Sequence, residues 1–260
     1  MIWSSLAGSL LLGLTAARGI PTNLQPRADI PAGSIIRTCA TPGVMALTFD
    51  DGPFIYTTKL LDQLEEADIK ATFFINGDNY ACIYNETEII NRAYQAGHQI
   101  ASHTWSHADL RKLDEDGIKN EMSRLEVGLS NVLGIKPTYM RPPFGSYNQR
   151  AQDVLAEMGY RIIMWDVDTG DSIGRNVTYS KKQITDAGTS GDGHVVLMHD
   201  PIRTTPNQLV PWVLQYAQEH ELRLVTVAEC LDDVGNEYTD PVPQTDEDTC
   251  TPPEDPEDSQ

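Results

Sequence analysis

The stretch VMALTFDDGP, residues 44–53, joins an uninterrupted apolar run to two adjacent aspartates. An apolar run bounded by a Gly-Pro turn predicts a buried β-strand, with Asp50 and Asp51 at its carboxyl end. Two ionised carboxylates side by side at a buried strand end repel each other and lose hydration, so another group must stabilise them. The stretch therefore predicts a functional site at the end of the first strand. A plain Asp-Asp-Gly-Pro surface turn is the simpler alternative.

Six further apolar runs of the same kind follow, at residues 71–76, 98–103, 138–141, 160–165, 194–199 and 223–227. Between the runs, apolar residues recur at helical spacing, least clearly at residues 180–187. Strands that alternate with helices predict parallel pairing through right-handed crossovers, and strands that are apolar throughout predict burial on both faces. The predicted fold class is therefore α/β, a single domain with about seven parallel strands. Both an open doubly wound sheet and a barrel satisfy this pattern.

The N-terminus predicts export. Residues 1–17 contain the apolar run LAGSLLLGLTAA, which ends in small residues as a secretory signal peptide does. A run this short is a poor membrane span, and no second long apolar segment occurs, so we expect a secreted, extracellular protein without a membrane partner. The sequons at Asn85 and Asn176 agree with a glycoprotein of that compartment.

Four cysteines also agree with an oxidising compartment, and none belongs to a Cys-x-x-Cys pair of the kind found in zinc ribbons. Cys39 precedes the first predicted strand and Cys230 follows the seventh, so a disulfide between them would join the two ends of the domain. Elimination then pairs Cys82 with Cys250, although four cysteines allow three connectivities.

The net charge of −19 is concentrated at the C-terminus, because residues 232–260 contain 11 acidic and no basic side chains. An acidic, Pro-rich segment of this kind predicts a disordered, solvated tail. The rest of the chain is acidic as well, which disfavours phosphate backbones, so no nucleic-acid partner is expected. We expect the protein to be a monomer.

Polar side chains stand at the ends of successive predicted strands. Besides the two aspartates of the first strand, they are His103 and His107 after the third, Arg141 after the fourth, Asp168 and Asp171 after the fifth, and His199 at the end of the sixth. The carboxyl ends of the strands share one face in parallel α/β folds, and active sites lie there. These side chains are therefore expected to converge.

The segment His103-Thr-Trp-Ser-His107 points to a metal site. One helical turn separates the two imidazoles, so both can face one cation, and a carboxylate from Asp50 or Asp51 would complete three protein ligands. Three ligands leave positions open for water or substrate, as in catalytic zinc sites. Two ordinary polar histidines are the simpler alternative, and two histidines with one carboxylate also suit a non-heme iron oxygenase.

Five motifs in this order, TFDDGP, HTWSH, RPPFGSYN, VDTGD and VLMHD, resemble those of the polysaccharide deacetylases, carbohydrate esterase family 4. The resemblance covers residues 38–231, and the late VAEC makes the chain most like secreted fungal chitin deacetylases. It implies an incompletely closed (β/α) barrel and a metal-dependent hydrolase that removes acetyl groups from N-acetylglucosamine units of chitin or chitooligosaccharides. The implied cofactor is Zn²⁺ or another divalent cation such as Co²⁺. An acetyl xylan esterase, a peptidoglycan deacetylase and a non-catalytic glycan-binding protein are the alternatives.

The resemblance assigns the principal roles as follows. Asp51, His103 and His107 would bind the metal, Asp50 would act as the general base, and His199 would act as the general acid. An amide carbonyl is a poor electrophile and an amine is a poor leaving group. Such a reaction therefore needs a cation to polarise the carbonyl, a base to activate water and an acid to protonate the amine.

Further residues would support these groups. Arg141 would hold Asp50 in position, and Asp168 or Asp171 would be the carboxylate that lies near Arg141 and His199. An arginine before a Pro-Pro turn can also be an ordinary surface residue, but neighbouring carboxylates favour a buried, charge-paired position.

A last group would contact the substrate. The backbone N–H of Phe144 would meet the oxyanion, and Leu197 would wall the acetyl methyl group. Trp105 and Trp165 are candidates for stacking on sugar rings, although such aromatic side chains often belong to the core. Ser172 stands where the fourth motif usually ends in Trp or Tyr, so the wall beside the acid is expected to differ from the family pattern.

Overall fold

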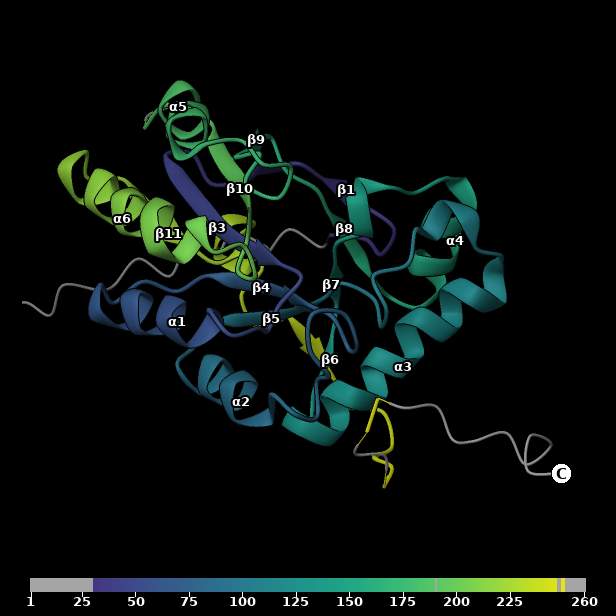
Figure 1. Ribbon diagram of the computed structural model, residues 1–260. Coiled ribbons are helices and arrows are strands. Elements are labelled where there is room, and N and C mark those ends of the chain that lie inside the picture. Colours follow the sequence, from purple (N-terminus) through teal and green to yellow (C-terminus); the bar gives the residue numbers. More distant parts are fainter. Residues whose placement is uncertain (1–29, 190, 247–248, 251–260) are drawn as a thin grey trace, which may run out of the picture.

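A computed structural model describes residues 30–189, 191–246 and 249–250 (Figure 1). The predicted signal peptide, residues 1–17, lies outside the described residues. Helices surround a strongly curved sheet in one α/β unit. Within the described ranges, no helix combines the length and the apolar character needed to cross a membrane.

The main sheet is barrel-shaped and mostly parallel. Its strand order is β1-β8-β7-β5-β4-β3-β10-β2, with β11 paired to β3 and β9 paired to β10. The ladder between β10 and β2 is antiparallel, and the other ladders of this sheet are parallel. The strands are Ile35–Ile36 (β1), Thr38–Cys39 (β2), Val44–Asp50 (β3), Thr72–Ile75 (β4), Gln99–Ser102 (β5), Tyr139–Met140 (β7), Arg161–Ile163 (β8), Val167–Asp168 (β9), Gly193–His199 (β10) and Arg223–Val225 (β11).

The seven predicted strands are confirmed, as β3, β4, β5, β7, β8, β10 and β11. The structure adds the short strands that nearly close the barrel. Strand β1 pairs with β8 and β2 pairs with β10, and Arg37 alone separates β1 from β2. This short N-terminal stretch therefore bridges the opening between β8 and β10. The prediction of an incompletely closed barrel is confirmed, and the open doubly wound sheet is excluded.

Helices follow the predicted apolar stripes. They are Thr57–Glu66 (α1), Thr87–Gln95 (α2), Glu115–Leu133 (α3), Gln149–Glu157 (α4), Val177–Ala187 (α5), Val210–Glu219 (α6) and Val227–Cys230 (α7). The least clear prediction, at residues 180–187, is confirmed as α5, which begins after Asn176 caps the backbone N–H of Tyr179. Helix α3 ends at Leu133, and the left-handed φ of 69° at its C-cap, Gly134, lets the chain leave the helix.

Side chains alternate along β3, and this alternation places the Asp50 carboxylate on the inner face at the carboxyl end of the strand. Val44 and Ala46 face an inner cluster of buried residues, whereas Met45, Leu47 and Phe49 face the cluster that lies under the helices. Because side chains alternate along a strand, Thr48 and Asp50 continue the inward row toward its carboxyl end. The first strand therefore has an apolar interior face that ends in two polar groups.

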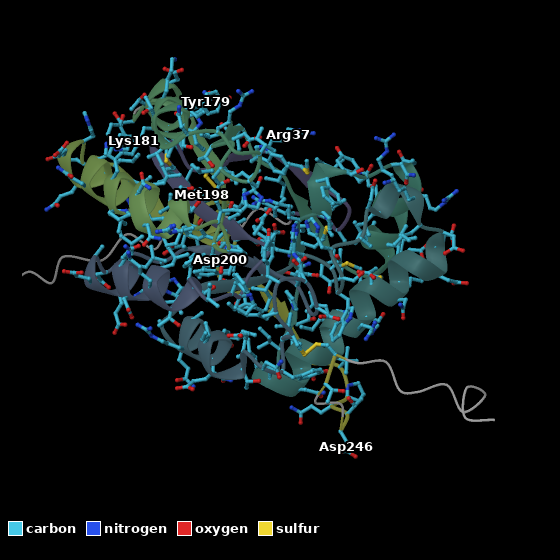
Figure 2. The ribbon with its side chains drawn as sticks, viewed as in Figure 1. Arg37, Tyr179, Lys181, Met198, Asp200 and Asp246 are labelled. Carbon is cyan, nitrogen blue, oxygen red and sulfur yellow. A yellow bond between two sulfur atoms is a disulfide. The ribbon has the colours of Figure 1, made fainter. Side chains whose placement is uncertain are left out.

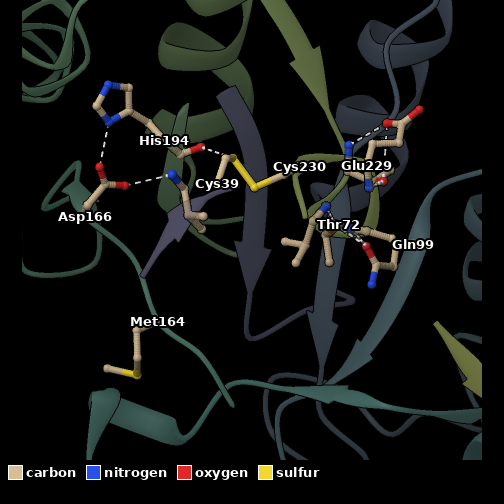
Figure 3. Close-up of a disulfide and its surroundings, with 12 residues drawn as sticks. Cys39, Thr72, Gln99, Met164, Asp166, His194, Glu229 and Cys230 are labelled. Carbon is tan, nitrogen blue, oxygen red and sulfur yellow. Dashed lines mark hydrogen bonds and ion pairs between the residues drawn. A yellow bond between two sulfur atoms is a disulfide. The ribbon is translucent and has the colours of Figure 1, made fainter. Parts of the chain in front are cut away.

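Both expected disulfides are confirmed. The bond between Cys39 and Cys230 joins β2 to the end of α7, and Figure 3 shows it beside the start of β10. The second bond joins Cys82 to Cys250 across 168 residues of sequence. Each bond restricts the conformations of the unfolded chain. The entropy of the unfolded state falls, and the folded state is stabilised relative to it.

The prediction of a disordered tail that begins at residue 232 is wrong for residues 232–246. Tyr238–Thr239 (β12) pairs with Lys136–Pro137 (β6), and the Tyr238 hydroxyl accepts a hydrogen bond from the backbone N–H of Ile100. Farther along, Gln244 and Thr245 hydrogen-bond to the C-terminal part of α3. Acidic composition suggested solvation, but a half-buried tyrosine, a strand pairing and the distant disulfide hold this segment to the barrel.

Candidate active site

A pocket of about 380 Å³ lies at the carboxyl ends of the barrel strands. Its walls come from the loops that follow successive strands, as the sequence predicted for this edge of the sheet. The lining residues are Asp50, Asp51, His103, His107, Pro142, Phe144, Gly145, Trp165, Asp168, Ser172, Ile173, Leu197 and His199.

Asp51, His103 and His107 form a cluster with the geometry of a cation site. Asp51 Oδ1 lies 3.3 Å from His103 Nε2 and 3.1 Å from His107 Nε2, and the three ligand atoms lie within 4.8 Å of one another. His103 Nδ1 lies 2.7 Å from the backbone oxygen of Arg141, which can only accept, so this nitrogen carries the proton of the neutral ring. His103 Nε2 then presents a lone pair to the same point as the carboxylate.

The donor set fits a divalent metal ion. Asp51 Oδ1 is buried without a hydrogen-bond partner in the structure, and a cation is the group that would satisfy it together with the imidazole lone pairs. Burial acts to raise the pKa of Asp51, but the neighbouring His103 and His107 lower it well below its usual value. The carboxylate is therefore ionised and ready to bind a cation.

The backbone at this cluster adopts costly conformations. Among the described residues, seven non-glycine residues have positive φ, and four of them lie here: Asp51 (76°), Thr104 (70°), His107 (58°) and Phe144 (60°). Each such residue costs on the order of 1–3 kcal/mol and persists only where surrounding contacts enforce it. Their concentration indicates that the loops are shaped to place particular side chains.

Two residues that the sequence analysis missed hold the His103–His107 loop in place. Asn76 Nδ2, at the end of β4, donates hydrogen bonds to the backbone oxygens of His103 and Thr104. Glu121 of α3 accepts from the backbone N–H of Ser106 at 2.8 Å and from its hydroxyl at 2.7 Å. No motif marked these residues, but a carboxylate on the otherwise buried face of α3 was a visible signal.

Asp50 has a different environment from its neighbour. Its Oδ1 accepts a hydrogen bond of 2.7 Å from Arg141, whose guanidinium is fully buried. Arg141 also donates to Thr48 and to the backbone oxygens of Ile163 and Met164. Arg141 thus fixes one oxygen of Asp50, while Asp50 Oδ2 lies 3.8 Å from His103 Nε2, on the side of the metal cluster.

His199 and Asp171 form a second histidine–carboxylate pair. His199 ends β10 directly opposite Asp50 of β3 in the parallel register. Asp171 Oδ1 lies 2.8 Å from His199 Nδ1, and its Oδ2 accepts from the backbone N–H of His199 and from the Thr205 hydroxyl. Burial alone would lower the pKa of His199, but the Asp171 carboxylate and the charges of Asp50 and Asp51 raise it to about 9.

The structure distinguishes the two aspartates of the fourth motif. Asp171 is buried against His199, whereas Asp168 is exposed, lines the pocket mouth and accepts from the backbone N–H of Gly170. Of the two groups that this carboxylate was expected to lie near, His199 is in contact with Asp171, whereas Arg141 pairs with Asp50.

The expectation that Trp105 stacks on a sugar ring is wrong. Its side chain is 1% exposed and packs in the core below the loop, with the guanidinium of Arg124 4.2 Å from the ring centre. The pattern could not show this, because an aromatic residue between two histidines suits either face of the loop. Trp105 instead supports the loop from beneath.

The remaining predicted contacts do lie at the pocket. Leu197 and Trp165 line it, and the ring of Phe144 packs edge-on against His107 at 4.6 Å between ring centroids. Ser172 and Ile173 occupy the mouth, where Ile173 is 72% exposed.

Asp200 is a further buried group that the sequence analysis did not single out. It lies below the DDGP turn near the middle of the molecule (Figure 2), is fully buried and accepts a hydrogen bond from Thr57. Burial raises its pKa to about 7. A Cβ on Gly52 would approach the Asp200 carboxylate to 2.1 Å, so the turn that carries Asp51 requires glycine there.

Comparisons with known proteins agree with this geometry. The family described as Polysaccharide deacetylase matches residues 37–163. A chitin deacetylase from Pestalotiopsis sp is 42% identical over 236 residues, which cover 88% of this chain and 76% of that protein. The chitin deacetylase of Colletotrichum lindemuthianum is 35% identical over 248 residues, or 92% of this chain and 99% of that protein.

Solved structures show the same fold. The structure of the chitin deacetylase from Colletotrichum lindemuthianum aligns with a TM-score of 0.78 over 81% of this chain and 97% of that chain, at 35% identity. The Bc1960 peptidoglycan N-acetylglucosamine deacetylase aligns with a TM-score of 0.69 over 77% of this chain and 94% of that chain, at 28% identity.

Proposed function

The chain belongs to the polysaccharide deacetylase family, and we propose that it is a metal-dependent hydrolase that removes acetyl groups from the N-acetylglucosamine units of chitin or chitooligosaccharides. The observation that carries this proposal is the convergence of Asp51, His103 and His107 beside Asp50, with His199 at the end of the adjacent strand. The similarity to two fungal chitin deacetylases over most of the chain supports chitin as the substrate.

The metal would be held by Asp51 Oδ1, His103 Nε2 and an imidazole nitrogen of His107. When bound, a divalent cation polarises the acetamide carbonyl and increases the acidity of water. Mixed nitrogen and oxygen ligands suit Zn²⁺, and Co²⁺ accepts a similar set. The hydrogen bond from His103 Nδ1 to the Arg141 carbonyl fixes that ring in the tautomer needed for binding.

Asp50 is proposed to take the proton from the attacking water. Its Oδ1 is held by Arg141, so the carboxylate keeps one orientation and its other oxygen stays on the pocket side. The developing negative charge on the acetyl oxygen would meet the backbone N–H of Phe144 in the turn of the third motif.

His199 is proposed to donate a proton to the departing nitrogen, so that the C–N bond breaks to give acetate and a free amine. Asp171 holds its Nδ1–H and raises its pKa to about 9, so the ring is protonated at neutral pH and can supply that proton through Nε2. Leu197 and Trp165 would receive the acetyl methyl group in the apolar part of the pocket.

The two disulfides support a secreted protein, with residues 1–17 as its signal peptide and residues 38–231 as the catalytic domain. A peptidoglycan deacetylase is the second candidate function, favoured by the structural similarity to the Bc1960 enzyme. An acetyl xylan esterase on the same scaffold would act on an ester, which needs the acid less than an amide does.

Mass spectrometry of N-acetylglucosamine oligomers tests the proposal. Incubation with the purified protein should lower the oligomer mass by one acetyl unit per turnover, and a chelator should abolish the change until Zn²⁺ is restored. Acetylxylan and peptidoglycan are tested as alternative substrates in separate, parallel reactions. Acetate release from peptidoglycan but not from chitin oligomers would transfer the function to the second candidate, and no release from any of them would refute the proposal.

A further inference from the structure

The carboxylate of Asp171 has a full set of hydrogen-bond partners. Its Oδ1 accepts from the backbone N–H of Ser172 at 2.9 Å and contacts His199 Nδ1 at 2.8 Å. Its Oδ2 accepts from the backbone N–H of His199 at 2.8 Å and from the Thr205 hydroxyl at 2.6 Å. A carboxylate offers about four acceptor positions, so these four contacts occupy it completely. Thr205 supplies one of the four.

The hydroxyl of Thr205 fixes the plane of this carboxylate. The χ2 torsion of an aspartate is broad, so a carboxylate tilts easily unless donors hold both of its oxygens. Burial acts to raise the pKa of Asp171, but the contacts with His199 and with the Thr205 hydroxyl lower it below its usual value. The carboxylate is therefore ionised, and Thr205 is a donor to it.

The side chain of Thr205 is suited to hold a fixed direction. Thr205 is completely buried, so water does not compete for its hydroxyl. Its branched Cβ restricts χ1, and the direction of the hydroxyl then follows from the backbone. A buried hydroxyl that lost its partner would be costly, which keeps the bond to Asp171 formed.

The backbone at Thr205 is unusual as well. Thr205–Leu209 form a π-helical turn at the start of α6, in which the N–H of Val210 donates to the Thr205 oxygen. Such turns are rare and are frequent at functional sites. The extra residue rotates Thr205 by about 100° around the helix axis relative to a regular α-turn. Helix α1 holds this turn, because Gln63 Nε2 donates to the Pro206 oxygen at 2.8 Å.

Two turns bring Thr205 back toward the end of β10. The N–H of Ile202 donates to the His199 oxygen at 3.3 Å, and the N–H of Thr205 donates to the Ile202 oxygen at 2.9 Å. His199 and Thr205 therefore belong to one folded segment, whereas Asp171 belongs to the loop after β9. The Thr205 hydroxyl joins this loop to the segment that carries the acid.

We propose that Thr205 is a positioning residue for the general acid, whose hydroxyl keeps the Asp171 carboxylate in the plane that holds the His199 ring for proton transfer. The inference rests on the proposed function and adds to it a residue outside the five motifs and outside the pocket lining. An amide needs a proton on its departing nitrogen, so loss of this alignment slows the acid step. Binding of the metal and of the substrate does not depend on it.

Kinetics on the N-acetylglucosamine tetramer test this role. Thr205→Val replaces the hydroxyl with a methyl group, and kcat should fall about tenfold while KM stays within about twofold of the wild-type value. Thr205→Ser keeps the hydroxyl and should retain most of the wild-type kcat. Thr204→Val changes the neighbouring threonine, whose side chain makes no capping hydrogen bond, and should have the wild-type kcat.

An ester with a good leaving group separates an effect on the acid from general damage. 4-Nitrophenyl acetate releases a phenolate that needs no proton, so Thr205→Val should hydrolyse it within about twofold of the wild-type rate. Equal losses on the tetramer and on this ester would overturn the inference, and so would a wild-type tetramer kcat. Thr205→Ala should show the same contrast, and it decides the question if the valine variant does not fold.

The His199 ring can also be observed directly in the zinc-loaded protein. The proton on Nδ1 gives a low-field NMR signal, which is identified by its absence in His199→Gln. The signal should shift in Thr205→Val and return to its wild-type position in Thr205→Ser. An unshifted signal in Thr205→Val refutes the inference, even where wild-type protein releases acetate. Wild-type protein that releases no acetate, with the shift present, refutes the proposed function instead.

Discussion

The pocket contains two histidine–carboxylate groups that have the same residue types and opposite arrangements. In the first, Asp51 faces the Nε2 atoms of His103 and His107, and His103 has its proton fixed on Nδ1 by a backbone oxygen. In the second, Asp171 lies against Nδ1 of His199. The first arrangement presents lone pairs to a cation, whereas the second keeps a proton on the ring. Hydrogen-bond geometry, and not residue type, therefore sets the task of each histidine.

Asp50 lies between the two groups, and its replacement should have the largest effect. Asp50→Asn keeps the shape and the contact with Arg141 but removes the proton acceptor, so acetate release should fall by about 10³-fold. The metal content of the purified variant, measured by elemental analysis, should equal that of the wild type. A metal-loaded Asp50→Asn protein with near wild-type turnover would show that the base lies elsewhere.

The second group is best tested through pH. A general acid must be protonated to act, so activity is lost as pH rises through the pKa of that acid. For His199 the neighbouring Asp171 raises this pKa to about 9. Asp171→Asn should return that pKa to 6.5 or below and move the alkaline limb of the kcat profile to lower pH. At pH 8 the protonated fraction, and with it kcat, should fall roughly 30-fold.

The matching control replaces Asp168, the exposed carboxylate of the same motif. Asp168→Asn should leave the alkaline limb where the wild type has it. Equal shifts in the two variants would mean that general negative charge, and not the contact with Nδ1, sets the titration of His199.

A smaller effect is expected when the support of the first group is weakened. Glu121→Gln replaces one of the two acceptors for Ser106, so the His103–His107 loop should lose order and the affinity for Zn²⁺ should fall about tenfold. Calorimetric titration of the metal-free protein measures this. Glu115→Gln, at an exposed position on the same helix, should bind Zn²⁺ as the wild type does; a wild-type affinity for Glu121→Gln would show that the loop holds its shape without it.

The sequence predicted most reliably those residue positions that the pattern of a single strand determines. The apolar run before Asp50 and the end of the run at His199 placed both residues at the same edge, because side chains at the carboxyl ends of parallel strands converge. The two disulfide pairings also followed from position and elimination. In these cases local periodicity and chain order were sufficient.

Features that depend on contacts between distant segments could not be predicted. The burial of Trp105 depends on α3, and the order of the C-terminal segment depends on Tyr238 reaching Ile100. The closing strands β1 and β2 have two residues each, too few to show a period. His199 pairs with Asp171 and not with Asp168. This choice depends on the path of the loop that carries both aspartates, which composition does not reveal.

The most direct test of the central claim is a calorimetric titration of metal-free wild-type and Asp51→Asn proteins with Zn²⁺, with acetate release measured on the same samples. The account predicts one tight site per chain in the wild type and the loss of both that site and the activity in the variant. A variant that binds Zn²⁺ with wild-type affinity and releases acetate at the wild-type rate would contradict it.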